Sequence, residues 1–423
     1  MDETRSPVYD VMILGSGYAG LAAALFAQKA GLKVALCGGA GAIDFSTGCI
    51  DLMAVVDGKR FDDPYEAITQ VVKSNPEHPF GRMAQEEIET ALTEFTGFLG
   101  SIGLPYVHSF GRNQRMVTFA GSIRRTYSVP MMSASCVAAL AATAPTLFVD
   151  FAGLKGFSAN QIVETRKADW PGLRSLRVRF PKPEGEFYPE AIARNLDFPN
   201  KREALADMVR EHVHDVEYIG FPAVLGYTDP PAAIAHLEEL LGRPVFEIPV
   251  MPPAISGARI RGIFERHMPT MGIELYPQKT VESVRVDENG EIEFSIGKKY
   301  PKTVRSRTTL LATGRFFSKG IRADRHTVRE SVFDLPVVQP AVRADWFKPD
   351  FFDPGGHGLH YAGIATDNLF RPCDENGQPM LQNLYAAGSI LAGNDWSRNK
   401  SGAGFAIATA WKAVECLRAE RSR

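Results

Sequence analysis

The chain begins with an apolar run that ends at a group of glycines. Residues 9–14 are almost wholly apolar, and they lead directly into a glycine-rich turn at residues 15–20. The alanine- and leucine-rich residues 21–27 favour a helix, and a second apolar run over residues 33–37 favours a strand. The pattern therefore predicts a strand, a tight turn, a helix and a second strand.

The glycine-rich turn has the spacing of a dinucleotide-binding fingerprint. In such a turn Gly15 permits the bend, Gly17 lets a phosphate approach the backbone, and Gly20 lets the helix pack closely on the strand. The start of the helix then offers N–H groups and a partial positive charge to an anion. We expect a nucleotide or flavin phosphate here; the alternative is a glycine-rich turn of some other α/β protein. The candidate cofactor-binding residues are Gly15, Ser16, Gly17, Tyr18, Ala19 and Gly20.

One usual feature of such a unit is missing. The second strand of a dinucleotide-binding unit normally ends in Asp or Glu, which binds the adenosine ribose. Here the strand ends in Cys37, and the first acid after it is Asp44. Either the ligand is shorter, such as FMN, or backbone groups hold the ribose of FAD or NAD. No Arg or Lys stands there to suggest the additional phosphate of NADP.

The rest of the chain repeats the alternation of strands and helices. Strand-like and helix-like segments alternate between residues 146 and 250, and helical periodicity covers residues 62–103. The predicted fold class is α/β, a Rossmann-like two-dinucleotide-binding flavoprotein fold with an inserted second α/β domain. We expect residues 1–60 and 251–423 to form a discontinuous flavin-binding domain. Residues 61–250 would form an inserted cap, substrate or partner domain.

Two later motifs complete the expected cofactor site. An apolar strand ends in Ala-Thr-Gly at residues 312–314, where glycine would allow close approach to a flavin. A strand with Gly388 then precedes a long helix with a glycine-rich start at residues 401–404. A helix N-terminus aimed at the flavin ring would stabilise negative charge on the reduced ring, whereas a helix without a cofactor role is the alternative. The candidates in these motifs are Ala312, Thr313, Gly314, Gly388, Ser389, Ser401, Gly402, Ala403 and Gly404.

A loop of small and hydroxylated residues follows the first βαβ unit. The loop over residues 44–52 could wrap a phosphate or a flavin ring with hydroxyl and backbone N–H groups, or it could be a plain surface loop. Its candidate cofactor-binding residues are Phe45, Ser46, Thr47 and Gly48.

Composition narrows the function classes. The net charge of -2 argues against a nucleic-acid-binding protein. None of the five cysteines forms a CxxC motif, so we expect no disulfide framework, no cysteine-ligated iron–sulfur cluster or other metal site, and a reduced, cytoplasmic setting. We also expect no signal peptide and no direct membrane span, so that any membrane contact would be made through a partner.

A basic loop before the last helix offers candidate substrate chemistry. Arg398 and Lys400 could bind an anionic substrate or a flavin phosphate, and His360 could act as an acid or a base. In dicarboxylate-reducing flavoproteins an arginine in a similar place binds a carboxylate. Solvated loop residues are the alternative for all three.

Four stretches together resemble one family. They are the glycine-rich unit at residues 11–21, the loop at residues 44–52, the Ala-Thr-Gly-Arg-Phe-Phe-Ser-Lys-Gly stretch at residues 312–320, and residues 363–372 with their Thr-Asp and Arg-Pro pairs. The chain resembles the B subunit of the anaerobic glycerol-3-phosphate dehydrogenase nearly end to end, including the missing acid after the second strand.

The resemblance implies a function within a complex. The family's complex oxidises sn-glycerol 3-phosphate to dihydroxyacetone phosphate and passes electrons to menaquinone. A separate catalytic (A) subunit carries FAD and the substrate chemistry, and an iron–sulfur (C) subunit docks at the inner face of the cell membrane. The B subunit is assigned FMN, with FAD as the alternative here. The resemblance supplies no catalytic residues. Two other interpretations stay open: a self-contained fumarate-reductase-like flavin oxidoreductase acting on a small anionic acid, and a flavin-free scaffold protein.

Overall fold

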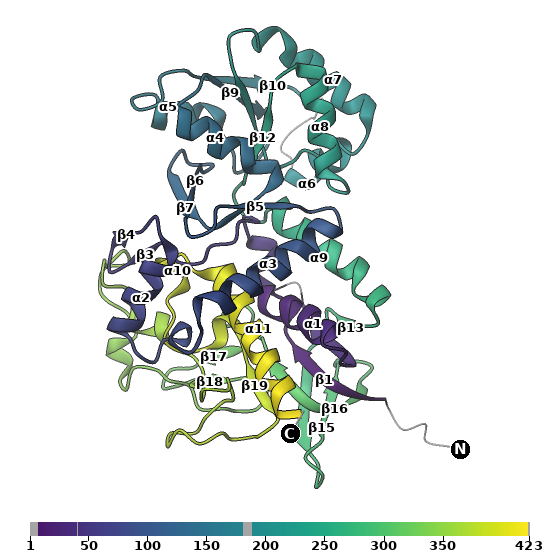
Figure 1. Ribbon diagram of the computed structural model, residues 1–423, viewed down its shortest axis with the longest axis vertical. Helices are drawn as coiled ribbons and strands as arrows, with labels where there is room; N and C mark the ends of the chain where they lie inside the picture. Colours follow the sequence, from purple (N-terminus) through teal and green to yellow (C-terminus); the bar gives the residue numbers. More distant parts are fainter. Residues whose placement is uncertain (1–6, 40, 181–187, 422–423) are drawn as a thin grey trace. The chain divides into compact units, whose positions relative to one another are not determined.

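The computed structural model describes residues 7–39, 41–180 and 188–421 (Figure 1). The chain divides into two compact units. The first unit comprises residues 1–42, 51–95 and 264–423, and the second comprises residues 43–50 and 96–263. The chain therefore leaves the first unit twice and returns to it twice.

A seven-stranded sheet forms the centre of the first unit. Its strand order is β13-β2-β1-β16-β15-β14, and β19 also pairs with β16. The pairings are parallel for β13 with β2, β2 with β1, β1 with β16, and β16 with β19. Strands β14, β15 and β16 form an antiparallel meander. The strands are β1 (Val8–Leu14), β2 (Val34–Gly38), β13 (Glu274–Pro277), β14 (Val281–Val286), β15 (Ile292–Ile296), β16 (Lys302–Leu311) and β19 (Leu384–Ala386).

Two long helices pack together beside this sheet. They are α1 (Tyr18–Lys29) and α11 (Gly402–Arg421), and α1 also contacts β1, β2 and β16. Nine consecutive residues of α1, residues 19–27, are buried. Such burial on every side requires small apolar residues, and the alanine-rich sequence supplies them. The unit also contains helices α2 (Pro64–Ser74) and α10 (Trp396–Asn399) and the short hairpins β3 (Val55–Val56) with β4 (Lys59–Arg60) and β17 (Ile321–Ala323) with β18 (Val328–Glu330).

The second unit has a parallel sheet of its own. Its strand order is β10-β9-β11-β12, and every pairing is parallel. The aromatic rings of Phe148, Trp170 and Phe246 meet edge to face in its core. The strands are β9 (Thr146–Phe151), β10 (Leu173–Val178), β11 (Tyr218–Pro222) and β12 (Val245–Ile248), with antiparallel pairs β5 (Tyr106–His108) and β8 (Ser128–Pro130), and β6 (Gln114–Val117) and β7 (Ile123–Thr126). The helices are α4 (Ala134–Ala142), α5 (Ala159–Arg166), α6 (Pro189–Asn195), α7 (Pro199–Val209) and α8 (Pro230–Leu241).

The predicted α/β class is confirmed, and the predicted helical region over residues 62–103 is divided into separate helices. Residues 62–103 form two α-helices, α2 and α3 (Gln85–Ser101), separated by a turn with Pro76 and by the short 3-10 helix η2 (Pro79–Arg82). Proline lacks an N–H and restricts the residue before it, so the chain cannot continue one helix through this turn. Both α3 and α9 (Ile255–His267) carry residues of the two units.

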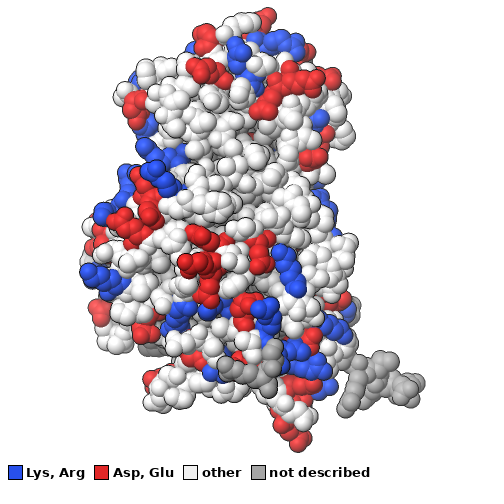
Figure 2. Space-filling model, viewed as in Figure 1, with Lys and Arg blue, Asp and Glu red and all other residues white. Residues whose placement is uncertain are grey.

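The distribution of charged side chains on the surface agrees with the near-zero net charge of the chain. On the face drawn in Figure 2, basic and acidic side chains are interspersed.

Within the described residues, none of the helices combines the length and the apolar character that crossing a bilayer requires.

Candidate flavin site

The carboxyl ends of three parallel strands meet in the first unit. Leu14 of β1 lies opposite Leu311 of β16, and Leu311 lies opposite Ala386 of β19. Backbone hydrogen bonds continue this alignment past the strand ends, from the Ala312 N–H to the Leu14 carbonyl (2.8 Å) and from the Ala387 N–H to the Leu311 carbonyl (3.0 Å). The three glycine motifs that follow these strands therefore start at one edge of the sheet. Ligands of parallel α/β sheets bind at this edge.

Two glycines of the first turn are required by the packing of the protein itself. Gly15 has a φ of +112°, and a Cβ there would collide with the backbone of Ala312. A Cβ at Gly20 would collide with the Gly15 carbonyl. Their role in the protein is therefore to let the turn, the helix and the ATG strand end approach each other closely.

Gly17 differs from Gly15 and Gly20 because the protein leaves empty the space that a side chain at this position would occupy. It has an ordinary φ of -80°, and a Cβ there would meet no atom within 4 Å. It is the N-cap of α1, no side chain caps this helix, and its first turn contains no acidic residue. The positive end of α1 and the open side of Gly17 are thus available to an anion, which fits a flavin phosphate.

The later motifs close around the same turn. A Cβ on Gly388, whose φ is +79°, would come within 2.6 Å of the Ala19 side chain, so η8 (Gly388–Ile390) packs against α1. A Cβ on Gly314 would lie 3.4 Å from the Ser389 hydroxyl. The structure therefore brings residues 15–20, 312–314 and 388–389 together in one cluster, as a site shared by the three motifs requires.

The start of α11 is partly used by the protein. The Gly404 N–H donates to the Asp51 carbonyl at 2.8 Å, and a Cβ on Gly404 would come within 2.7 Å of that oxygen. The Ser401 hydroxyl is buried and lies 3.0 Å from the Asn394 amide oxygen. The predicted contacts of Ser401, Gly402, Ala403 and Gly404 with a flavin remain predictions.

The loop with Phe45, Ser46, Thr47 and Gly48 belongs to the second unit. The Ser46 hydroxyl accepts the Gly48 N–H at 3.0 Å, and the Gly48 carbonyl accepts the Tyr106 hydroxyl at 2.6 Å. These bonds shape the loop locally, and its predicted contact with the cofactor remains a prediction.

At the end of β2 the structure offers no carboxylate from its own strand. Gly38 packs tightly, since a Cβ there would come within 2.7 Å of the Ser16 nitrogen. The Ser16 hydroxyl hydrogen-bonds to the Gly39 carbonyl, so this predicted cofactor-binding side chain is directed to the backbone of the second strand. The turn thus leaves space for an anion, and the end of β2 lacks the usual anchor for an adenosine ribose.

The three candidate substrate residues lie in two segments of the first unit. His360 lies in η7 (Gly358–Tyr361), and its Nδ1 is 3.1 Å from Asp395 Oδ2. The guanidinium of Arg398, in α10, donates to the Pro354 carbonyl. Lys400 ends α10 in a left-handed conformation with a φ of 53° and is exposed. His360 and Arg398 are thus connected through the loop that contains Asp395, while Lys400 points to the surface of the same loop.

Arg315 is not among the predicted site residues, yet it connects this loop to the flavin motifs. Its buried guanidinium donates to the carbonyls of His360, Leu391 and Asn394, the last two at 2.9 Å. Burial lowers the pKa of Arg315 to about 10, which leaves it charged at neutral pH. Because Arg315 directly follows Gly314, it fixes the His360 and Asn394 backbones next to the ATG strand end. The sequence around Arg315 does not indicate this role, because an arginine after the glycine at a strand end is not a recognisable pattern.

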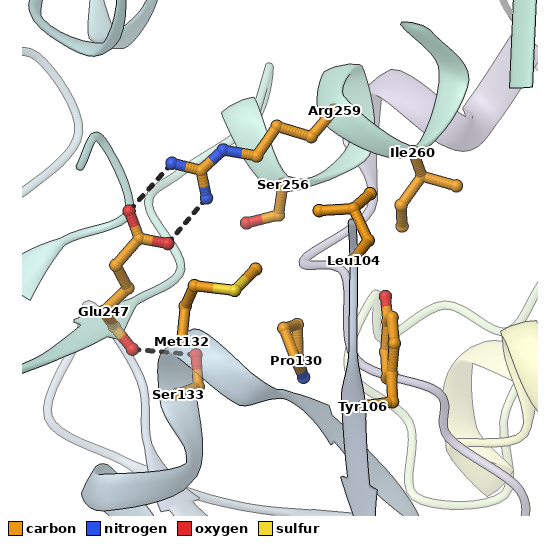
Figure 3. Close-up of a pocket in the computed structure, with 9 residues that line it drawn as sticks. All are labelled: Leu104, Tyr106, Pro130, Met132, Ser133, Glu247, Ser256, Arg259 and Ile260. Carbon is orange, nitrogen blue, oxygen red and sulfur yellow. Dashed lines mark hydrogen bonds and ion pairs between the residues drawn. The ribbon is translucent and has the colours of Figure 1, made fainter. Parts of the chain in front are cut away.

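A small pocket lies within the second unit (Figure 3). Arg259 forms a bidentate ion pair with Glu247, at 2.6 and 2.9 Å, and both side chains are 3% exposed. The Ser133 hydroxyl donates to the Glu247 backbone carbonyl at 2.9 Å, and the Tyr106 hydroxyl, which also lines the pocket, is bonded to Gly48. These polar groups already have protein partners, so the arrangement is that of a structural core.

The cysteine thiols of the described chain are enclosed in the fold. All five cysteines are buried and unbridged, and burial raises the pKa of Cys37 and Cys136 to about 12. Such thiols are poor nucleophiles because the thiolate is disfavoured. Among the described residues there is no group of three or more His, Cys, Asp or Glu side chains placed to hold a metal ion.

Comparison with known proteins is consistent with this geometry. The FAD binding domain family matches residues 10–405. The B subunit of the anaerobic glycerol-3-phosphate dehydrogenase of Vibrio vulnificus is 29% identical, over 96% of this chain and 95% of its own length. The corresponding B subunit of Yersinia pseudotuberculosis is 30% identical, over 97% of this chain and 98% of its own length. Among solved structures, a 3-ketosteroid delta1-dehydrogenase from Sterolibacterium denitrificans is 13% identical, with 98% of this chain and 100% of that chain covered and a TM-score of 0.44.

These matches extend over nearly the whole chain and include the glycine-rich turn, the ATG strand end and the start of the last helix. The resemblance to this family and the assignment as a flavin-dependent oxidoreductase are therefore confirmed. The chain belongs to the FAD binding domain family and, within it, to the family of B subunits of the anaerobic glycerol-3-phosphate dehydrogenases.

Proposed function

We propose that this chain is the flavin-binding electron-transfer component of a complex that oxidises sn-glycerol 3-phosphate to dihydroxyacetone phosphate. In this proposal a separate FAD-containing catalytic (A) subunit oxidises the substrate. Our chain passes the electrons to an iron–sulfur (C) subunit and on to menaquinone, at the inner face of the cell membrane. The names of the relatives support the substrate and the existence of partner proteins.

The observation that carries the proposal is the open side of Gly17 at the uncapped start of α1. The protein leaves the open side of Gly17 and the positive end of α1 unoccupied, so the phosphate of a cofactor is suited to bind there. When bound there, a flavin can accept an electron pair and release single electrons, which suits a relay to iron–sulfur clusters. Residues 15–20, 312–314 and 388–389 would hold it.

We propose FMN as the flavin, with FAD as the alternative. The support is the end of β2, where Cys37, Gly38 and Gly39 offer no carboxylate for an adenosine ribose. FMN carries no adenosine and needs no such anchor. In the same proposal the α/β segment within residues 61–250 is a cap or partner-binding domain.

A second candidate function is favoured by the residues around Asp395. His360 and Arg398 both contact this aspartate, and together they offer a proton carrier and a positive charge. A self-contained flavin oxidoreductase acting on a small anionic acid would use such groups. This candidate predicts turnover by the isolated chain.

The absorption spectrum of the purified chain, followed by heat release and chromatography of the flavin, tests the proposal. FMN at one equivalent is the expected result. FAD would reject the FMN proposal and strengthen the self-contained enzyme. A colourless chain that stays colourless when mixed with FMN and with FAD would reject flavin binding and leave a scaffold role.

A further inference from the structure

A buried aspartate connects the candidate histidine and arginine. The Asp395 side chain is 2% exposed, whereas that of His360 is 38% exposed. Asp395 Oδ2 lies 3.1 Å from His360 Nδ1, and Asp395 Oδ1 accepts the backbone N–H of Arg398 at 3.2 Å. Both oxygens of this carboxylate are therefore directed at donor positions.

This contact determines which nitrogen of His360 carries the proton. A carboxylate accepts hydrogen bonds and donates none, so Nδ1 of a neutral His360 ring must be the protonated nitrogen. Nε2 then has a free lone pair, and within the described chain no side chain or backbone group hydrogen-bonds to it. The half-exposed edge of the ring is thus a proton acceptor.

The neighbouring histidine has a different arrangement. His357 is buried, its Nδ1 accepts the Lys348 N–H at 3.0 Å, and its Nε2 lies 3.1 Å from the Phe351 carbonyl. Both of its nitrogens are used to hold the loop over residues 347–357. Its ring lies edge-on to the His360 ring, with centroids 5.0 Å apart, and so helps to fix the orientation of His360.

The pair formed by His360 and Asp395 lies beside the candidate flavin cluster. Arg315, which directly follows Gly314, donates to the His360 carbonyl and to the carbonyl of Asn394, the residue before Asp395. The backbones that carry both partners are therefore anchored to the ATG strand end. Arg398 contributes a positive charge from the helix that Asp395 caps.

We propose that Asp395 is a positioning residue that holds His360 ready to take the proton of a substrate hydroxyl. The substrate class is a small anionic alcohol, such as a phosphate ester, whose charge Arg398 would attract. The O–H bond breaks, its proton goes to His360 Nε2, and the carbonyl forms as the C–H electron pair leaves as a hydride, for which a flavin is the acceptor. The inference rests on the second candidate function, in which this chain itself oxidises a small anionic substrate at the proposed flavin site, and it goes further by assigning the proton transfer of that oxidation to His360.

Replacement of Asp395 by asparagine has a specific expected consequence. The backbone N–H of Arg398 can only donate, so the amide oxygen of an asparagine must face it. The amide NH₂ then faces His360 Nδ1, which must become an acceptor, and the proton moves to Nε2. Asp395→Asn therefore switches the tautomer of His360 and blocks its lone pair.

The test measures the tautomer directly, without substrate or flavin. The full chain is labelled with ¹⁵N-histidine, spectra are recorded at about pH 8.5, where imidazole is neutral, and His360→Gln assigns the resonances. The wild type is expected to show a protonated Nδ1, and Asp395→Asn a protonated Nε2. Asp63→Asn is the matched control, because Asp63 likewise caps a helix, α2, and has no histidine partner. A protonated Nε2 in the wild type, or an unchanged tautomer in Asp395→Asn, would overturn the proposal.

Turnover then tests the role in catalysis. With sn-glycerol 3-phosphate, a soluble electron acceptor and the flavin-loaded chain without partner subunits, we expect turnover by the wild type and a kcat at least about 100-fold lower in Asp395→Asn. Absence of turnover by the wild-type chain alone would overturn its role in substrate oxidation. The flavin content and KM should stay within about 2-fold of the wild type, as with Asp63→Asn. Unchanged kcat with a switched tautomer would overturn the proton-acceptor role. Absence of flavin from the wild type would reject the proposed function, while the tautomer measurement would still decide whether Asp395 positions His360.

Discussion

The glycine turn of the first unit and the small pocket of the second unit differ in whether the protein itself supplies partners for their polar groups. In the pocket, Arg259 and Glu247 bind each other and the backbone, so the charged groups are already paired. At the turn, Gly17 faces open space and α1 has no side-chain cap. Polar groups that already have protein partners stabilise the fold. A helix end without a cap, next to unoccupied space, is suited to a ligand. The pocket is therefore the structural site and the turn the candidate binding site.

The largest loss of stability should follow from breaking the pair in the second unit. Glu247→Gln leaves the buried Arg259 guanidinium without its counter-charge, and we expect the free energy of unfolding to fall by about 3–5 kcal/mol. Urea unfolding measures this loss. Asp215→Asn, which breaks the exposed Arg174–Asp215 pair, is the control and should change stability by less than about 1 kcal/mol. Equal losses in the two variants would show that the buried pair does not stabilise the second unit.

A smaller, pH-dependent effect should arise from a buried histidine of the first unit. Burial lowers the pKa of His78 to about 4, below the 6.5 of an exposed histidine. The unfolded chain thus takes up a proton before the folded chain does, so stability falls as the pH falls from 6.5 to 4. The loss from this group should reach about 3 kcal/mol.

His78→Asn should remove this dependence on pH. Asparagine can still accept the Phe80 N–H, which His78 Nδ1 now accepts at 3.2 Å, but it does not titrate. Unfolding curves at pH 7 and pH 4.5 measure the difference between the two proteins. An equal loss of stability in both proteins on acidification would assign the pH dependence to other groups.

The smallest effect on stability, and the largest on ligand binding, should come from Gly17→Val. The fold has room for the side chain, so we expect stability to change by less than about 1 kcal/mol. The same side chain would occupy the place of the phosphate, and the bound flavin should be lost. Flavin absorbance per purified chain measures the loss.

Gly97→Val is the matched control for this variant. Gly97 lies in α3, and a Cβ there would also meet nothing within 4 Å. This variant should keep its flavin. A full complement of flavin in Gly17→Val would contradict the phosphate site at the turn, and the comparison between the two regions would then lose its basis.

The elements of the candidate flavin site could be predicted from the sequence because their signals are local. The strand, turn and helix of residues 9–27 follow from an apolar run, three spaced glycines and a run of alanines. The same holds for the ATG strand end and the long last helix. In each case neighbouring residues contain the pattern, so no knowledge of distant contacts is needed.

The way in which these elements meet depends on the folded chain. The order of the sheet places β16 between β1 and β15, with β19 beside its end, and no sequence spacing specifies that order. The contact between His360 and Asp395 joins residues 35 positions apart, and the bond from Arg315 to His360 spans 45 positions. Side-chain pairs of this kind depend on packing between distant segments, which local hydrophobic patterns do not encode. Local sequence thus specifies the glycine turn and the flavin-type motifs, whereas tertiary packing sets the pairing of the charged and titratable residues.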